Sequence, residues 1–396
     1  MASSFSHFRP RQRPPRSGRA LPSPLPDSLV SYIQGADASI AEGFKGITTD
    51  GQVVPGLFPI QRTGAATQPI KDAVEAFLAT LSPEQRAKTL FAVGGDEWRR
   101  WSNIHLYVMR HGAPLDEMSP AQRERALAVL RQSLSARGFE TARDVMKLNE
   151  TIAEITDRFE EYGEWLYWLS VMGTPSADEP WGWQIDGHHL IVNCFVLKDQ
   201  VVMTPVFMGT EPAAAEGGKY AGTRAFQAEE DDGLALMRAL TADQRGQATL
   251  ADQVPREVFT TAFRDNFELR YEGLRYDDLS PDQQSRLLGL VETYVGRMRP
   301  DHAAVKMAEV KEHLADTYFA WMGGCDDDSV FYYRVHSPVI LVEFDHLPGI
   351  ALDNDYPTRN HIHTVVRTPN GNDYGKDLLR QHREQFDHSP PAAAHA

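Results

Sequence analysis

Four short segments of the chain carry the same helix-starting signal, and their spacing constrains the fold more than any other feature. Residues 82–85, 119–122, 241–244 and 280–283 each place Ser or Thr three residues before Gln, and Pro follows the hydroxyl residue in three of them. This is a capping box, in which the hydroxyl accepts from the Gln backbone N–H and the Gln side chain accepts from the capping backbone N–H. Each segment therefore predicts the start of a helix.

The same elements recur in the same order in both halves of the chain. Downstream of the boxes, residues 184–193 align with residues 334–343, and strand-like segments ending in Thr-Pro follow at residues 201–205 and 365–369. An ordered series of this kind is typical of an internal duplication, here of about 160 residues. The alternative is chance recurrence of a common capping pattern, which explains the boxes more easily than it explains their order.

Within each half, helical periodicity comes first and strand alternation second. Helices are predicted at residues 70–81, 83–93, 120–134 and 141–156, and again at 231–240, 281–298 and 303–315. Strands are predicted at residues 164–172, 181–186, 189–196 and 201–207, and again at 318–322, 330–336, 339–344 and 361–367. Strands that follow helices favour an α+β fold with antiparallel sheets. We expect two halves, residues 61–225 and 226–390, related by a pseudo-twofold axis and forming one compact unit.

Residues 1–60 are expected to form a Pro/Arg-rich arm and lead-in that is partly disordered. Residues 1–26 contain five arginines and no acidic residue, together with many Pro and Ser. Such a composition buries too little apolar surface to fold by itself. The alternative is an Arg-rich segment used for targeting or for contact with phosphate.

Charge and hydropathy exclude several classes of partner. The formal net charge is -15 at pH 7, which argues against general nucleic-acid binding because that needs a basic face. No apolar run reaches the roughly 18 residues of a membrane-spanning helix, and the N-terminal residues lack the apolar core of a secretory signal. With two cysteines, Cys194 and Cys325, no cysteine zinc cluster is available. We expect a cytoplasmic protein without a nucleic-acid or membrane partner; the oligomeric state is left open.

Two histidine clusters are the strongest candidates for chemistry. His361 and His363 lie two residues apart in a predicted strand, so both imidazoles point to one face of it. His188 and His189 are adjacent and should point to opposite faces. His189 shares its parity with Asn193, which aligns with Glu343 in the second half.

These residues could converge between the two halves on a metal ion. His189, His361 and His363 would supply nitrogen ligands, Glu343 an oxygen ligand, and His188 is a further candidate ligand. Such a set suits zinc, iron, copper or manganese, and ligand type alone does not choose among them. The alternatives are a metal-free catalytic or polar cluster, and unrelated surface histidines.

Glycine-rich loops after the two Thr-Pro segments add candidate catalytic and substrate-binding residues. The first loop carries Tyr220 and Arg224, and the second carries Tyr374 and Lys376. The cations could hold a carboxylate or a phosphate, as could Arg367 in the preceding strand. Ordinary turn chemistry is the alternative for both loops.

Two further residues near the histidines could take part. Glu211, in the turn after residue 207, is a candidate general base or additional metal ligand, or else a solvated turn carboxylate. Trp183 lies beside the His-His turn and could form a wall of a substrate pocket, although aromatic residues in strands usually belong to the core.

The segments at residues 179–189, 209–212, 361–364 and 372–375 resemble domain-of-unknown-function family 3500. They contain Gly-His-His, Gly-Thr-Glu-Pro, His-Ile-His and Asn-Asp-Tyr-Gly, and the resemblance extends over roughly residues 66–388. It implies that these motifs are hallmarks of the family, and it implies no activity.

The residues favour a metal-dependent enzyme that acts on a small, possibly anionic molecule. A metal could activate water for hydrolysis or bind dioxygen for oxidation, and the sequence does not separate these reactions. The alternative is a non-catalytic protein that binds a metal ion or a small molecule in the same pocket.

Overall fold

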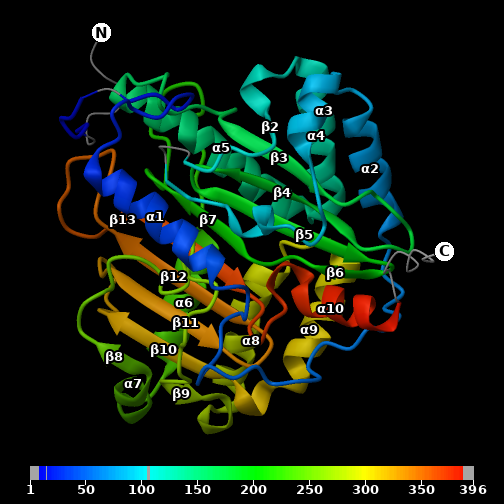
Figure 1. The fold of residues 1–396 in the computed structure, drawn as a ribbon. Coiled ribbons are helices and arrows are strands. Elements are labelled where there is room, and N and C mark those ends of the chain that lie inside the picture. Colours follow the sequence, from blue (N-terminus) through cyan, green and yellow to red (C-terminus); the bar gives the residue numbers. More distant parts are fainter. Residues whose placement is uncertain (1–8, 15, 105–107, 387–396) are drawn as a thin grey trace.

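One large mixed sheet forms the centre of the protein (Figure 1). The structure is a computed structural model that describes residues 9–14, 16–104 and 108–386. In the described residues the sheet has 13 strands, and its main path runs β1-β3-β4-β5-β7-β13-β12-β11-β10-β8. Helices accompany the sheet in both halves, so the α+β class is confirmed.

The strands of the first half are β1 (Leu90–Phe91), β2 (Ala113–Pro114), β3 (Tyr167–Met172), β4 (Trp181–Gly187), β5 (Leu190–Leu197), β6 (Gln200–Val202) and β7 (Val206–Thr210). The strands of the second half are β8 (Thr249–Ala251), β9 (Leu274–Arg275), β10 (Tyr318–Gly323), β11 (Phe331–His336), β12 (Leu341–Leu347) and β13 (Thr358–Arg367). The strand predicted at residues 201–207 is divided in two, because Thr204 and Pro205 separate β6 from β7.

The helices are α1 (Asp27–Ala41), α2 (Gln68–Leu78), α3 (Pro83–Thr89), α4 (Pro120–Ser133), α5 (Ala136–Thr156), α6 (Gln227–Ala239), α7 (Ala242–Ala248), α8 (Pro281–Val295), α9 (Pro300–Glu312) and α10 (Lys376–Gln385). All four predicted capping boxes are formed, with both reciprocal hydrogen bonds present at the starts of α3, α4, α7 and α8. The sequence did not predict α1, which lies within the expected arm and lead-in.

The two halves join edge to edge through an antiparallel pair. β7 pairs with β13 between Val206–Val366 and Thr210–Ile362, so the strands of both halves belong to one continuous sheet. Most neighbouring strands are antiparallel, as expected, but β1 runs parallel to β3 and β8 runs parallel to β10. The prediction of purely antiparallel sheets is therefore corrected at the two edges, where short strands follow α3 and α7.

The two faces of the sheet carry different chemistry because side chains alternate along each strand. The face covered by α2, α4, α5, α6, α8 and α9 is apolar and forms the main core. The opposite face, which we call the loop face, is covered by α1, α10 and long loops; in Figure 1, α1 and α10 lie in front of the sheet. Buried polar residues line the loop face at Gln184, Asp186, Asn193, Glu343, Asp345, His361, His363 and Arg367.

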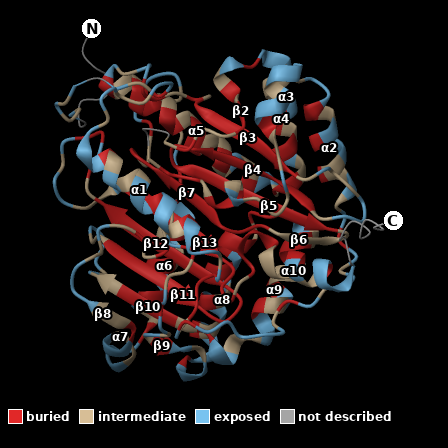
Figure 2. Ribbon diagram, in the orientation of Figure 1, coloured by how far each residue is buried: buried red, intermediate tan, exposed pale blue. Residues whose placement is uncertain are grey.

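Figure 2 shows that the strands are buried almost throughout, so the loop face is covered as thoroughly as the helical face. Burying polar groups is costly unless they are hydrogen-bonded. A polar face of this extent under a cover of loops is therefore where function is to be sought.

The described part of the N-terminal arm lies against the rest of the protein. Arg13 pairs with the buried carboxylate of Glu161, and Arg11 pairs with Asp355 at 3.0 Å. Both arginines contact segments far along the chain, which shows how an isolated, apolar-poor segment becomes ordered through ion pairs. Residues 1–8 and 15 lie outside the described residues. In the described ranges, no helix combines the length and the apolar character needed to cross a bilayer.

A buried ion network anchors the loop face near the centre of the sheet. Arg367 is fully buried; its guanidinium contacts Asp265 at 2.8 Å and Asp373 at 3.2 Å and donates to the backbone oxygen of Thr260. Asp265 also accepts from Arg99 at 2.9 Å. The predicted substrate-binding residue Arg367 thus holds two covering segments onto β13.

Replacing Arg367 by Met should lower the free energy of unfolding by about 3–5 kcal/mol, because the change leaves buried carboxylates short of their cation. The matched control is Arg380→Met, which removes an exposed arginine paired with Asp377 and Glu384 and should cost at most about 1 kcal/mol. Urea unfolding followed by circular dichroism measures both. Equal effects of the two variants would show that the buried network does not stabilise the fold.

Candidate metal centre

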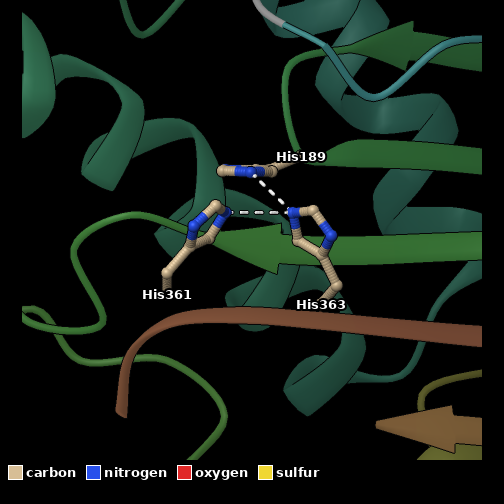
Figure 3. A group of neighbouring side chains, drawn as sticks. All are labelled: His189, His361 and His363. Carbon is tan, nitrogen blue, oxygen red and sulfur yellow. Dashed lines mark hydrogen bonds between the residues drawn. The ribbon is translucent and has the colours of Figure 1, made fainter. Parts of the chain in front are cut away.

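Three imidazoles meet on the loop face of the sheet (Figure 3). The Nε2 atom of His363 lies 3.1 Å from Nε2 of His361 and 3.0 Å from Nε2 of His189. All three side chains are buried. Nitrogens bound at about 2.0–2.1 Å to one tetrahedral metal ion are about 3.3 Å apart, so this spacing is close to that of a metal-binding triad. We call His189, His361 and His363 the histidine triad.

Each member of the triad is placed by a local feature of the sequence. His361 and His363 occupy alternate positions on β13 and so share one face. His189 ends the two-residue turn between β4 and β5 and has a positive φ of 60°. Its backbone oxygen accepts from Gly209 N at 2.8 Å, which fixes the turn against β7. The predicted convergence of these three histidines is what the structure shows.

The second ring nitrogen of two triad members is held by an acceptor. His361 Nδ1 lies 2.6 Å from the carbonyl oxygen of Pro348, and His363 Nδ1 lies 2.7 Å from a carboxylate oxygen of Glu257. A carbonyl or carboxylate oxygen only accepts, so both Nδ1 atoms carry the hydrogen, and in the neutral form of each ring Nε2 presents a lone pair. Burial lowers the pKa of His361 and favours this neutral form. The same pattern orients histidines that bind metal ions in other proteins.

Gly209 makes room for the triad. It lies opposite His363 in the register of β7 and β13. A Cβ atom at this position would lie 2.8 Å from Cδ2 of His363, 3.2 Å from Cδ2 of His189 and 2.6 Å from the backbone oxygen of Ile362. The first residue of the Gly-Thr-Glu-Pro motif must therefore be glycine for the imidazoles to pack as they do.

Glu211 lies behind the triad. Its carboxylate accepts from the backbone N–H groups of residues 350, 351 and 352, each at 3.0 Å. One oxygen is 4.0 Å from His361 Nδ1. Both oxygens are thus engaged by the loop that also carries Pro348, whose carbonyl holds His361. In this arrangement Glu211 positions the loop that holds His361, and it does not reach the Nε2 atoms of the triad.

Glu343 holds a second loop in the way that Glu211 holds the first. Its buried carboxylate accepts from the backbone N–H groups of Phe259 and Thr260 at 2.7 and 2.9 Å, from the Thr260 hydroxyl, and from the Tyr332 hydroxyl at 2.8 Å. These contacts fix the segment that begins with Glu257. Glu211 and Glu343 therefore anchor the two loops that hold the Nδ1 atoms of His361 and His363.

His188 packs against the triad from outside. Its ring stacks on that of His189 with centroids 3.9 Å apart, and its Nδ1 lies 2.7 Å from the side-chain oxygen of Asn149. It does not belong to the group whose ligand atoms converge. The side-by-side arrangement follows from the turn, which places the two imidazoles face to face.

The candidate residues of the first glycine-rich loop lie in other surroundings. The Tyr220 hydroxyl donates to Glu164, which also pairs with Arg143 and Lys219. Arg224 is exposed. Trp183 is buried in the apolar core on the helical face and donates to the Ser133 hydroxyl at 3.2 Å. None of these contacts involves the histidine triad.

The candidate residues of the second glycine-rich loop belong to the network around Arg367. The Tyr374 hydroxyl donates to Asp265 at 3.0 Å and accepts from Trp101 at 2.8 Å. Lys376 donates to the backbone oxygens of Gly94 and Gly95 at 3.4 and 3.2 Å, and burial lowers its pKa to about 8. These contacts tie the covering segments together.

Two carboxyl groups beside the triad were not predicted. Glu257 lies in a loop without any periodic pattern, so no sequence signal could have found it. Asp345 lies on β12 directly opposite His363, and it shares its parity with Glu343. Alternation along the predicted strand, extended by one residue, could have placed it on the same face.

Replacing Gly209 by Ala should lower the free energy of unfolding by about 1–3 kcal/mol, because the added methyl group overpacks the triad against backbone. The control is Gly246→Ala in α7, where an added Cβ meets nothing within 4 Å; it should stabilise by about 0.5–1 kcal/mol through helix propensity. Chemical denaturation gives both values. If Gly209→Ala left the free energy of unfolding unchanged, the imidazoles would have room to move.

Comparison with known proteins gives a family and no further relative. No curated protein matches the chain, and no solved structure matches it. The family model described as "Protein of unknown function (DUF3500)" matches residues 63–376, a range that contains all three histidines of the triad. The resemblance to this family is confirmed, and the chain belongs to the DUF3500 family.

Proposed function

We propose that the protein is a metal-dependent enzyme acting on a small molecule, with the metal ion bound by Nε2 of His189, His361 and His363. The observation that carries this proposal is the pair of fixed tautomers. With hydrogen on both Nδ1 atoms, the Nε2 atoms of His361 and His363 face each other as two lone pairs 3.1 Å apart. Two lone pairs at this distance repel unless a proton or a metal ion lies between them, and a metal ion can be shared with the third imidazole as well.

The donor set fits a transition metal of the expected kind. Neutral imidazole nitrogens suit zinc, iron, copper or manganese, and burial lowers the pKa of His361 and favours its neutral form. The loops anchored by Glu211 and Glu343 hold the ligands from behind, as orienting groups around metal sites do. When bound, such a metal would activate water or a small substrate as a Lewis acid, or bind dioxygen.

An open coordination position distinguishes an enzyme from a storage or structural site. Among the described residues, the ligand atoms that converge come from three histidines alone, and the nearby carboxylates of Glu211 and Glu343 are engaged by backbone N–H groups. Three protein ligands with a further position for water or substrate are typical of catalytic zinc sites. This supports an enzyme over the alternative of a non-catalytic metal- or small-molecule-binding protein.

Metal content of the untagged protein tests the proposal. The wild type should carry about one metal ion per chain, and His361→Ala combined with His363→Ala should remove most of it, because one imidazole alone holds a metal weakly. His313→Ala, at the end of α9 and outside the triad, is the matched control and should keep the metal.

Inductively coupled plasma mass spectrometry gives the metal and its amount, and circular dichroism checks that each variant is folded. Full metal content in the folded double variant would refute the proposed ligands. A wild type that binds no offered metal would refute the metal site itself, and the triad would then be a hydrogen-bonded cluster.

We also propose that the chain consists of two duplicated halves, residues 61–225 and 226–390, related by a pseudo-twofold axis. Equivalent hairpins have the same register, since Gln184 pairs with Asn193 and Arg334 pairs with Glu343. The order of strands outward from the β7–β13 pair is also the same in both directions. On the axis that this implies, the hydroxyl of Thr204 donates to its counterpart Thr368 at 2.8 Å.

Superposition of an experimental structure tests the duplication. When β4 and β5 are placed on β11 and β12, the capping boxes of α3 and α4 should fall on those of α7 and α8. Boxes that remain far apart after this superposition would contradict a common origin of the halves.

A further inference from the structure

Asp345 is a buried carboxyl group without a structural partner. Its side chain is fully buried on the loop face; the only donor that acts on the carboxyl group is the backbone N–H of its neighbour His346, and neither oxygen accepts a full hydrogen bond. The other carboxylates beside the triad differ in this respect, since Glu211 and Glu343 accept several hydrogen bonds and Glu257 accepts one from His363. A buried acceptor left unpaired costs stability, so its presence needs a reason outside the free fold.

The position of Asp345 points to the histidine triad. Asp345 pairs directly with His363 across β12 and β13, and residues paired in this way carry their side chains on the same face with Cβ atoms about 4.5–5.5 Å apart. On the other side of His363, its partner on β7 is Gly209. Asp345 is thus the carboxyl group nearest in the sheet to the triad that no other part of the described chain uses.

The charges that act on this region are negative. Burial raises the pKa of Asp345, and the negative charges of Glu257 and Glu343 raise it further; only the backbone N–H of His346 lowers it. Glu211 and Glu257 likewise act on His361. The predicted substrate-binding cations have other roles, because Arg367 is paired with Asp265 and Asp373 and Lys376 faces backbone oxygens.

Glu257 lies between the triad and solvent. The side chain of Glu257 is 31% exposed, whereas that of His363, to which it is bonded, is 5% exposed. The carboxylate therefore connects the buried triad with solvent.

We infer that the small molecule bound at the triad presents a hydroxyl or ammonium donor to Asp345 and is neutral or cationic. The inference rests on the proposed function for the metal, and it replaces the anionic substrate suggested by the sequence with an alcohol or amine. An anion would add a like charge beside Glu257 and Glu343. A hydroxyl or ammonium group would instead supply the hydrogen bond that Asp345 lacks.

Three probes of equal size and different head group test this inference: 1-propanol, propylammonium and propionate. Ligand-observed NMR should show that zinc-loaded wild-type protein binds at least one donor probe about tenfold or more tightly than propionate, since a hydrogen bond to a charged group corresponds to about 1.5–3 kcal/mol. Asp345→Asn should reduce binding of that probe about tenfold while metal content stays unchanged. A larger loss for propylammonium than for 1-propanol would identify an amine, because the Asn amide oxygen still accepts from a hydroxyl.

Asp355→Asn is the matched control, since Asp355 is an exposed carboxylate on the connection between β12 and β13 and pairs with Arg11. It should leave the affinity for all three probes unchanged. The selectivity of the wild type needs no variant, so it remains a test if Asp345→Asn does not fold.

Propionate binding as tightly as both donor probes, or no binding of either donor probe, would overturn the inference. Loss of metal from a folded Asp345→Asn variant would also overturn it and make Asp345 a ligand. The same titrations on chelator-treated protein separate the two proposals. If the protein binds no metal but still prefers the donor probes, the inference stands and the metal-dependent function is refuted. If the protein binds metal but shows no preference for the donor probes, the metal site stands and the inference is refuted.

Discussion

The antiparallel pairing of β7 with β13 is the contact on which the rest of the structure depends. It joins strands about 150 residues apart in sequence into one sheet. It also places the glycine of one strand opposite the second histidine of the other, so that the turn bearing His189 meets His361 and His363. The strand pairing that makes the sheet continuous therefore also brings the triad together.

Alternation along the strands then divides the structure into two environments. Apolar residues on one face pack against six helices and supply the hydrophobic free energy of the fold. Polar residues on the other face are covered by α1, α10 and loops, and each needs a partner under that cover. Most find one in a distant segment, such as Gln184 with Trp98 or Arg367 with Asp265. Asp345 and His336 stand out because, among the described residues, no side chain gives either of them a hydrogen bond.

Local signals in the sequence predicted much of this arrangement. The capping boxes located helix starts because their hydrogen bonds involve only neighbouring residues. Parity along a strand correctly brought together His189, His361 and His363, because a side chain's face is a local property. The joining of both halves into one sheet with parallel edge strands was not predicted, since pairing depends on segments far apart in the chain.

The roles of the charged candidates could not be read from local signals for the same reason. Parity placed Glu343 on the correct face, but it could not show that the backbone of residues 259 and 260 would claim its carboxylate. The cations Arg367 and Lys376 were assigned to substrate because their partners come from other segments. Glu257 lies in an irregular loop, where only the folded chain brings it to His363.

The late position of β13 in the chain has a consequence for biosynthesis. Two of the three triad histidines and the central strand that joins the halves are all supplied by residues 358–367. A ribosome that has completed β1 to β12 has made a chain in which β7 lacks its partner strand and its unpaired backbone edge can associate with other chains. The same chain offers a metal ion only His189 of the triad. Arrival of one ten-residue strand closes the open edge and completes the imidazole cluster together, so under the proposed function metal uptake would report that the sheet is closed.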